Sequence, residues 1–175
     1  MKKILILTIV AFVALFSQNA TAQENENVKA GQFMIGTTAG LNLERYNYIF
    51  SITPYAEYLI IDRLGLGAQL GCSVHGAGVG TGANAKGVVG VFGAYYVPMA
   101  RKFYFKPMLE VNLGFTGSGA GVGYEVALVP AFQYFPYKKL SFLLKTGGLS
   151  YGDLNADGAC LNLAYRMALG FAYSF

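Results

Sequence analysis

The chain has 175 residues, of which 54% are hydrophobic and only 13% are charged, and its formal net charge is +4. Its basic residues form no dense run, so the composition excludes a typical nucleic-acid-binding protein. Beyond the N-terminal region, no stretch is long and apolar enough to cross a membrane as a helix, so the apolar residues must be distributed by alternation, which is typical of β-strands.

The N-terminus has the layout of a secretory signal peptide. Lys2 and Lys3 precede the apolar run ILILTIVAFVALF, and a polar stretch then closes on Ala20-Thr21-Ala22. A basic region, a short apolar region and a small-x-small site predict cleavage after Ala22. The apolar run, of about 13 residues, is shorter than the roughly 20 that a membrane-spanning helix needs. The region contains no cysteine, which argues against a lipid-anchored lipoprotein.

From about Gly31 to the end, large apolar residues alternate with small or polar ones. The apolar phase contains Phe33, Ile35, Leu41, Leu43, Phe50, Ile52, Tyr58, Ile60, Leu66, Leu70, Val74, Leu109, Val111, Leu113, Val126, Leu128, Phe142, Leu144, Leu169, Phe171, Tyr173 and Phe175. The segment 87–97 is ambiguous in phase. Tyr58, Tyr96 and Tyr134 recur at intervals of 38 residues, and Tyr173 follows after 39. Because each interval accommodates one hairpin, the mature chain is predicted to hold about eight strands.

The connections between these strands are of two kinds. One kind is short and charged, with Asp62-Arg63, Arg101-Lys102 and Lys138-Lys139. The other kind is mostly longer and rich in glycine, and lies around Tyr46 and over residues 75–87, 116–123 and 151–159. Short turns at one end and longer loops at the other indicate an all-β, up-and-down, antiparallel transmembrane β-barrel of about eight strands. We expect residues 23–30 to form a short periplasmic segment and residues 31–175 the barrel domain.

The small face is predicted to point into the barrel. It carries too few charges to serve as a water-facing exterior, whereas an eight-stranded barrel has little interior space beyond its side chains. Closure also pairs every backbone group, as hydrocarbon requires. The inward charges are three acids and three bases, namely Glu57, Glu110, Glu125, Lys106, Lys145 and Arg166. We interpret them as a polar plug that ties strands together; the alternative is an ion path.

Two hairpins, PYAEYLIIDRLGLGAQLG and PAFQYFPYKKLSFLLKTG, and the terminal Phe175 carry a family resemblance. With these features the chain resembles the small, porin-like outer-membrane β-barrel proteins of Bacteroidetes, which are similar in architecture to OmpA- and OmpX-type barrels. The resemblance implies that the last strand, with Tyr173 and Phe175, is the signal read by the outer-membrane assembly machinery. It implies no activity, and this chain has no attached peptidoglycan-binding domain.

Other candidate sites are weak. His75, the single histidine, has no local motif that supplies a nucleophile and an orienting carboxylate, so we expect a rim residue. Asp153, Asn155 and Asp157 match the opening of a calcium loop, but Ala164 stands where the bidentate glutamate belongs, so a plain turn is the favoured reading. Cys72 and Cys160 are placed on non-neighbouring strands, which favours two unpaired cysteines over a disulfide.

Together these features predict an integral protein of the bacterial outer membrane with a structural or interaction role. We expect outer-membrane lipid and the assembly machinery as partners, no nucleic acid, no cofactor, no catalysis and a monomer. One alternative is a narrow channel for ions or small solutes. The other is a lipid-active outer-membrane enzyme that uses His75.

Overall fold

The computed structural model describes residues 28–43, 47–77, 84–116, 122–152, 158–162 and 167–175. Within these ranges the chain is all β, and it contains no helix that could cross a membrane. The strands are β1 (Phe33–Leu43), β2 (Asn47–Ile61), β3 (Leu64–Ala77), β4 (Asn84–Tyr95), β5 (Val97–Ala100), β6 (Phe103–Thr116), β7 (Val122–Tyr134), β8 (Leu140–Lys145), β9 (Gly148–Gly152), β10 (Gly158–Asn162) and β11 (Ala168–Ser174).

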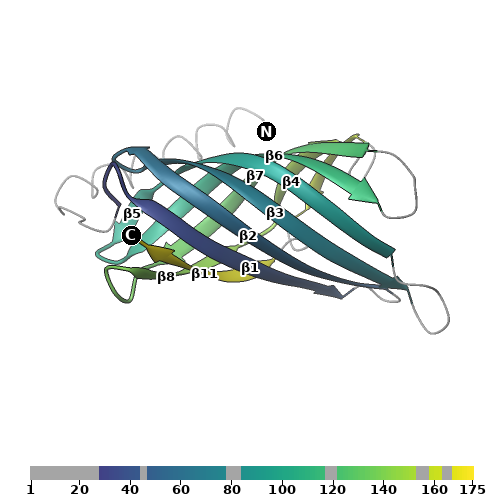
Figure 1. Cartoon of the computed structure of the whole chain (residues 1–175), viewed down its shortest axis with the longest axis horizontal. Coiled ribbons are helices and arrows are strands. Elements are labelled where there is room, and N and C mark those ends of the chain that lie inside the picture. Colours follow the sequence, from purple (N-terminus) through teal and green to yellow (C-terminus); the bar gives the residue numbers. More distant parts are fainter. Residues whose placement is uncertain (1–27, 44–46, 78–83, 117–121, 153–157, 163–166) are drawn as a thin grey trace, which may run out of the picture.

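These segments close into an antiparallel barrel of eight strands, because β4 with β5, β8 with β9, and β10 with β11 each make one barrel strand (Figure 1). The first and last strands complete the circle, since β1 pairs with β11 from Met34↔Ser174 to Gly40↔Ala168. The predicted fold class is therefore confirmed, and the pairing of the first and last strands closes the barrel.

The two ends of the barrel differ. The turns at residues 62–63, 101–102 and 135–139 lie at the same end as the C-terminus, at the left of Figure 1. We call this the short-turn end, and the opposite end, to which the predicted glycine-rich connections belong, the long-loop end.

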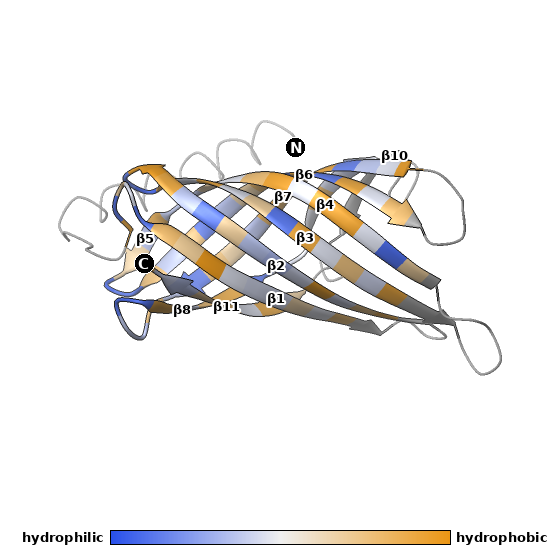
Figure 2. Ribbon diagram, in the orientation of Figure 1, coloured by the Kyte–Doolittle hydropathy of each residue, from blue (hydrophilic) through white to orange (hydrophobic). Residues whose placement is uncertain are grey.

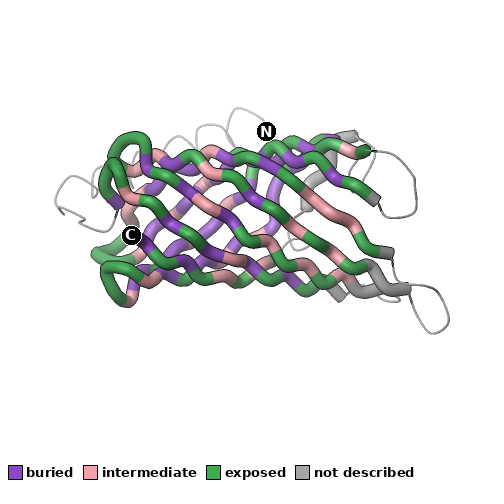
Figure 3. The backbone as a smooth tube through the Cα atoms, in the orientation of Figure 1, coloured by how far each residue is buried: buried purple, intermediate pink, exposed green. Residues whose placement is uncertain are grey.

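Exposed and buried residues alternate along the strands (Figure 3), and the large apolar residues predicted to face outward are on the exposed phase, while polar, small and some large apolar residues are buried inside. Figure 2 shows the hydropathy of the same residues. On β6, Leu109 is 54% exposed on the outer surface, whereas its neighbour Met108 is 1% exposed inside the barrel. The same phase holds on the other strands whose side chains are described. The predicted apolar phase is therefore confirmed.

The tyrosine repeat is not a repeat of orientation. Tyr58 and Tyr134 are exposed on the outer surface, but Tyr96 is completely buried inside the barrel. In the segment of ambiguous phase, Tyr95 takes the outward position and Phe92 points inward. The interval of 38 residues therefore reflects the length of a hairpin. The strand register changes the inward and outward phase by one residue between β3 and β4, and this turns Tyr96 inward.

Prolines account for the breaks within the barrel strands. The ladder between β2 and β3 lacks pairs at Thr53 and Pro54, and the break between β4 and β5 faces Pro107. Pro130 on β7 faces the break between β8 and β9. There the backbone N–H and the hydroxyl of Thr146 both donate to the Pro130 carbonyl, each at 3.0 Å. Because proline has no N–H to give, one of the two ladders beside each of these prolines is interrupted, while the ladder on its other side continues.

Inward glycines make room for large inward side chains on the neighbouring strand. A Cβ atom at Gly67 would overlap the ring of Phe92 and the carbonyl oxygen of Ala56. A Cβ atom at Gly65 would likewise overlap the carboxylate of Glu57. In so narrow a barrel, each bulky inward residue thus requires a missing side chain beside it.

We therefore expect Gly67→Ala to destabilise the barrel by about 1–3 kcal/mol, the range typical of overpacking a filled interior. The matched control is Gly93→Ala on the outer surface, where a Cβ atom would meet only Leu66 at an ordinary contact distance. The measurement is the free energy of unfolding from urea titration in detergent. Equal stability of the two variants would contradict the tight packing of Phe92 over Gly67.

Candidate functional site in the barrel interior

Apolar side chains close the barrel at its short-turn end. Val28, Met34, Leu59, Tyr96, Tyr104 and Phe135 are all buried and form one cluster, which we call the end cluster. The ring of Tyr104 packs edge-on against Tyr96 and Phe135, with centroids 6.0 and 5.5 Å apart. Side chains therefore fill the mouth at this end.

The segment before β1 is tied to the end cluster. The N–H of Gly31 donates to the carbonyl of Leu59 at 2.8 Å, and the N–H of Leu59 donates to the carbonyl of Gln32 at 2.9 Å. The N–H of Ala30 donates to the carboxylate of Asp62 at 2.8 Å. These bonds hold the segment in the position from which Val28 completes the cluster.

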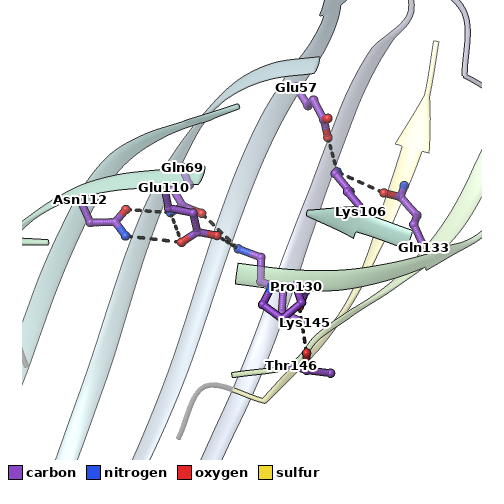
Figure 4. Close-up of polar contacts among 9 residues, drawn as sticks. All are labelled: Glu57, Gln69, Lys106, Glu110, Asn112, Pro130, Gln133, Lys145 and Thr146. Carbon is purple, nitrogen blue, oxygen red and sulfur yellow. Dashed lines mark hydrogen bonds and ion pairs between the residues drawn. The ribbon is translucent and has the colours of Figure 1, made fainter. Parts of the chain in front are cut away.

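Next to the end cluster, on the side toward the middle of the barrel, lies a polar group that we call the lower tier: Glu57, Tyr96, Lys106, Gln133 and Ser141. The ammonium of Lys106 lies 2.6 Å from the Glu57 carboxylate and donates to the amide oxygen of Gln133 at 3.1 Å (Figure 4). The hydroxyl of Tyr96 donates to Glu57 at 3.0 Å, and Gln133 donates to Ser141 at 2.7 Å. The Lys106 ammonium also lies 4.6 Å from the centre of the Tyr96 ring, a cation–π contact.

Nearer the middle of the barrel lies a second group, the upper tier: Gln69, Glu110, Asn112 and Lys145. Lys145 lies 2.7 Å from the carboxylate of Glu110 (Figure 4). The amide of Gln69 donates to Asn112 at 2.8 Å and to Glu110 at 3.1 Å. The two tiers link residues from strands that are far apart along the chain.

The two ion pairs differ in exposure. The side chains of Lys106 and Glu57 are both 0% exposed, whereas those of Lys145 and Glu110 are 10% and 6% exposed. Beyond the upper tier, inward positions on β2, β3 and β4 become half-buried. They are Ser51, Thr53, Gly71, Ser73, Lys86 and Val88. Solvent therefore reaches into the barrel from the long-loop end as far as the upper tier, and the lower tier is sealed.

Four of the six charges predicted to face inward thus meet in two ion pairs. Glu125 is buried on β7, opposite Asn112 in the register with β6. Arg166 lies outside the described residues. The neutral partners Gln69, Asn112, Gln133 and Ser141 were not predicted as site residues. The sequence feature that could have identified them is their position in the same inward phase of the strand alternation as the charged residues.

The remaining candidates are placed only in part. His75 lies near the end of β3, opposite Asn84 of β4. Cys72 is a free, exposed cysteine on β3, and Cys160 belongs to β10, which is not a neighbour of β3. Asp153, Asn155 and Asp157 lie outside the described residues. Among the residues that are described, no group of three or more His, Cys, Asp or Glu side chains could hold a metal ion.

The last strand is joined to the first at its final residue. The N–H of Phe175 donates to the carbonyl of Phe33 at 2.9 Å. The ring of Phe175 lies 6.2 Å from that of Phe33 and 5.1 Å from that of Tyr173, measured between centroids. All three rings are exposed on the outer surface at the short-turn end.

Removing the charge of Lys106 is expected to destabilise the protein strongly. Lys106→Met leaves the carboxylate of Glu57 buried without its cation, which typically costs about 3–5 kcal/mol. The free energy of unfolding in detergent should fall accordingly. It should recover in part in the double variant Lys106→Met/Glu57→Gln, which leaves no buried charge.

Lys145→Met provides the matched comparison, because Glu110 keeps its hydrogen bonds to Gln69 and Asn112 and has some access to water. Its loss of stability should be smaller than that of Lys106→Met. The reverse order would contradict the sealed lower tier.

A known structure shares this architecture. A de novo designed transmembrane β-barrel superimposes with a TM-score of 0.51 and 13% sequence identity, over 84% of this chain and 98% of the designed one. The outer-membrane expressed OmpT of Vibrio cholerae gives a TM-score of 0.32 at 13% identity, over 73% of this chain and 40% of OmpT. Its loop L8 deletion mutant also gives 0.32, at 15% identity, over 82% and 48%. No protein-family model and no curated protein matches this chain. The likeness to the designed barrel shows the fold alone, which is that of a small transmembrane β-barrel.

Proposed function

We propose that this chain is an integral protein of the bacterial outer membrane, with a structural or interaction role and an interior closed to ions. The observation that carries the proposal is the fully buried Lys106–Glu57 pair, which lies directly above the end cluster. An ion entering from the long-loop end meets the upper tier first and then this sealed layer. The proposal therefore places the protein's interactions on its outer surface and at its two ends.

The outer surface supports a lipid environment. Large apolar residues are exposed on every one of the eight barrel strands, from Ile35 on β1 to Phe171 on β11. Soluble monomers rarely expose an apolar surface of this extent. In a bilayer the same surface is matched to the hydrocarbon, and barrel closure leaves no unpaired strand edge in lipid.

The two alternatives have less support. Conduction requires that ions pass the Lys106–Glu57 pair and then the end cluster, both of which are buried. The enzyme alternative uses His75, which belongs to neither tier and lies near the end of β3, and a catalytic role for the interior would need polar groups that are available to a substrate. The side chains of both tiers are instead held in hydrogen bonds with one another. We therefore assign neither activity to the chain.

The direct test is electrical. Folded protein reconstituted into a planar lipid bilayer should give no steady conductance steps, with a conducting porin in the same bilayer as the positive control. Compactness of the reconstituted protein is checked by its heat-dependent migration on a gel. A stable unitary conductance from folded protein would overturn the plugged interior and favour the channel.

Lipid exposure has its own test. Leu109 lies near the middle of β6, where an arginine on the lipid face costs about 2–4 kcal/mol, whereas Phe115 lies near its end, where the cost falls to about 0–1 kcal/mol. Leu109→Arg should therefore destabilise protein folded in phospholipid vesicles more than Phe115→Arg does. Equal losses would argue against a bilayer around β6.

We also propose that Tyr173 and Phe175 are read by the outer-membrane assembly machinery. Deleting Phe175 removes one backbone hydrogen bond and one ring, but leaves the pairing of β1 with β11 from Met34 to Gly40. Refolding into detergent should therefore be nearly normal, while insertion into the outer membrane of cells should fall.

Two controls separate this reading from simple loss of packing. Phe175→Tyr keeps a terminal aromatic and should insert normally. Phe33→Ala removes the ring that Phe175 contacts and keeps the C-terminus intact. If Phe33→Ala lowers insertion as much as the deletion does, the effect comes from ring packing, and the assembly reading is wrong.

A further inference from the structure

The short-turn end gathers basic side chains that are far apart in the sequence. Each of its three turns contributes at least one, and the segment before β1 adds another. The six basic residues are Lys29, Arg63, Arg101, Lys102, Lys138 and Lys139, and among the described residues at this end the only acidic side chain is Asp62. All of the six except the half-buried Arg63 are exposed. We call this set the basic ring; the turns that bear it are coloured blue at the left of Figure 2.

A belt of aromatic side chains lies beside the basic ring, and all of its residues are exposed except the half-buried Phe103. Phe33 and Tyr58 face each other across β1 and β2, and Phe103 and Tyr134 do so across β6 and β7. Tyr173, whose ring lies 5.9 Å from the ammonium of Lys139, continues the belt. Aromatic side chains gather at the boundary between hydrocarbon and headgroups. The basic ring, one or a few residues further along each strand, therefore lies at the level of the headgroup phosphates.

Contacts of the turns hold part of the basic ring in place. The ammonium of Lys102 donates to the carbonyl of Pro136 at 2.8 Å, which joins the second turn to the third. Arg63 has a φ of 69°, a left-handed conformation that glycine or asparagine adopts more readily. Asp62 accepts a hydrogen bond from the N–H of Ala30, so the acid in this region serves to hold the chain. A basic side chain is thus kept at a position that favours a different residue type.

We propose that the basic ring binds the headgroups of anionic phospholipids in the leaflet at the short-turn end. This inference rests on the proposed membrane location. Lysine and arginine form charge-assisted hydrogen bonds with phosphate oxygens. Each basic residue close to an anionic leaflet contributes an attraction equivalent to about a fivefold change in a binding constant. Several such residues around one rim give the barrel a preference for anionic over zwitterionic lipid at that rim.

The test measures which lipids the folded protein retains. The protein is reconstituted in vesicles that contain phosphatidylcholine and phosphatidylglycerol, extracted gently, and analysed by native mass spectrometry for both lipids. We expect several-fold enrichment of phosphatidylglycerol over the vesicle composition. Arg101→Gln should remove part of this enrichment, by at most about fivefold, and Arg101→Gln/Lys138→Gln/Lys139→Gln should remove more of it, with Lys29, Arg63 and Lys102 remaining.

Lys86→Gln is the matched control, because it removes one positive charge from β4 near the long-loop end. It should leave the enrichment unchanged. Equal losses from Lys86→Gln and Arg101→Gln would mean that net charge decides, and would overturn the assignment to the basic ring. Added inorganic phosphate and chloride of the same ionic strength should weaken the enrichment equally. A loss specific to phosphate would identify free phosphate as the ligand and overturn the inference.

The same vesicles separate this inference from the one on which it rests. Folded protein that fails to float with the vesicles would overturn the membrane location and the headgroup site together. Folded protein that floats with the vesicles but retains both lipids in the vesicle ratio would overturn the headgroup site alone.

Discussion

The pairing of buried charges inside a narrow barrel is the constraint on which the rest of the structure depends. A lysine in the interior of eight strands, such as Lys106, cannot reach water by bending toward the surface, so it needs a partner from another strand. Glu57 is that partner, and Tyr96 and Gln133 satisfy the remaining hydrogen-bonding capacity. Because the four residues come from separate parts of the barrel wall, their bonds tie those parts together across the interior.

Space limits the interior as strictly as charge does. The carboxylate of Glu57 occupies the position where a side chain on Gly65 would lie, and the ring of Phe92 does the same at Gly67. At these two positions a glycine and a large inward side chain form a pair across neighbouring strands, and a Cβ atom at Gly36 would meet the ring of Tyr55 in the same way. A bulky residue can therefore be placed at another inward position only if the neighbouring strand has a glycine beside that position.

The sequence predicts the side-chain orientations that depend on the two-residue period of a strand. It does not predict the orientations and contacts that depend on the register between strands. Strict alternation on β6 was sufficient to place Met108 inside and Leu109 outside. Segment 87–97 offered no such pattern, so Tyr96 was grouped with Tyr58 and Tyr134 although it points inward. Phase was sufficient to identify the buried charges among the described residues, but Lys106 and Glu57 are 49 residues apart, and only the register of the strands between them brings them together. The prolines did carry a readable signal, because each of Pro54, Pro107 and Pro130 faces an interrupted ladder.

The same distinction applies to the surface. As a sequence, the basic residues are scattered pairs that form no patch, and only the up-and-down topology brings every second turn to one end. The end cluster fills the mouth of the barrel at that end, and the fully buried Lys106–Glu57 pair lies next to it. If the interior is closed, recognition must occur where side chains meet the surroundings: at the lipid face, at the long loops, or at the basic ring. Of these three surfaces, the basic ring has both defined turn positions and a defined charge among the described residues. It therefore indicates most directly which chemical groups a partner needs.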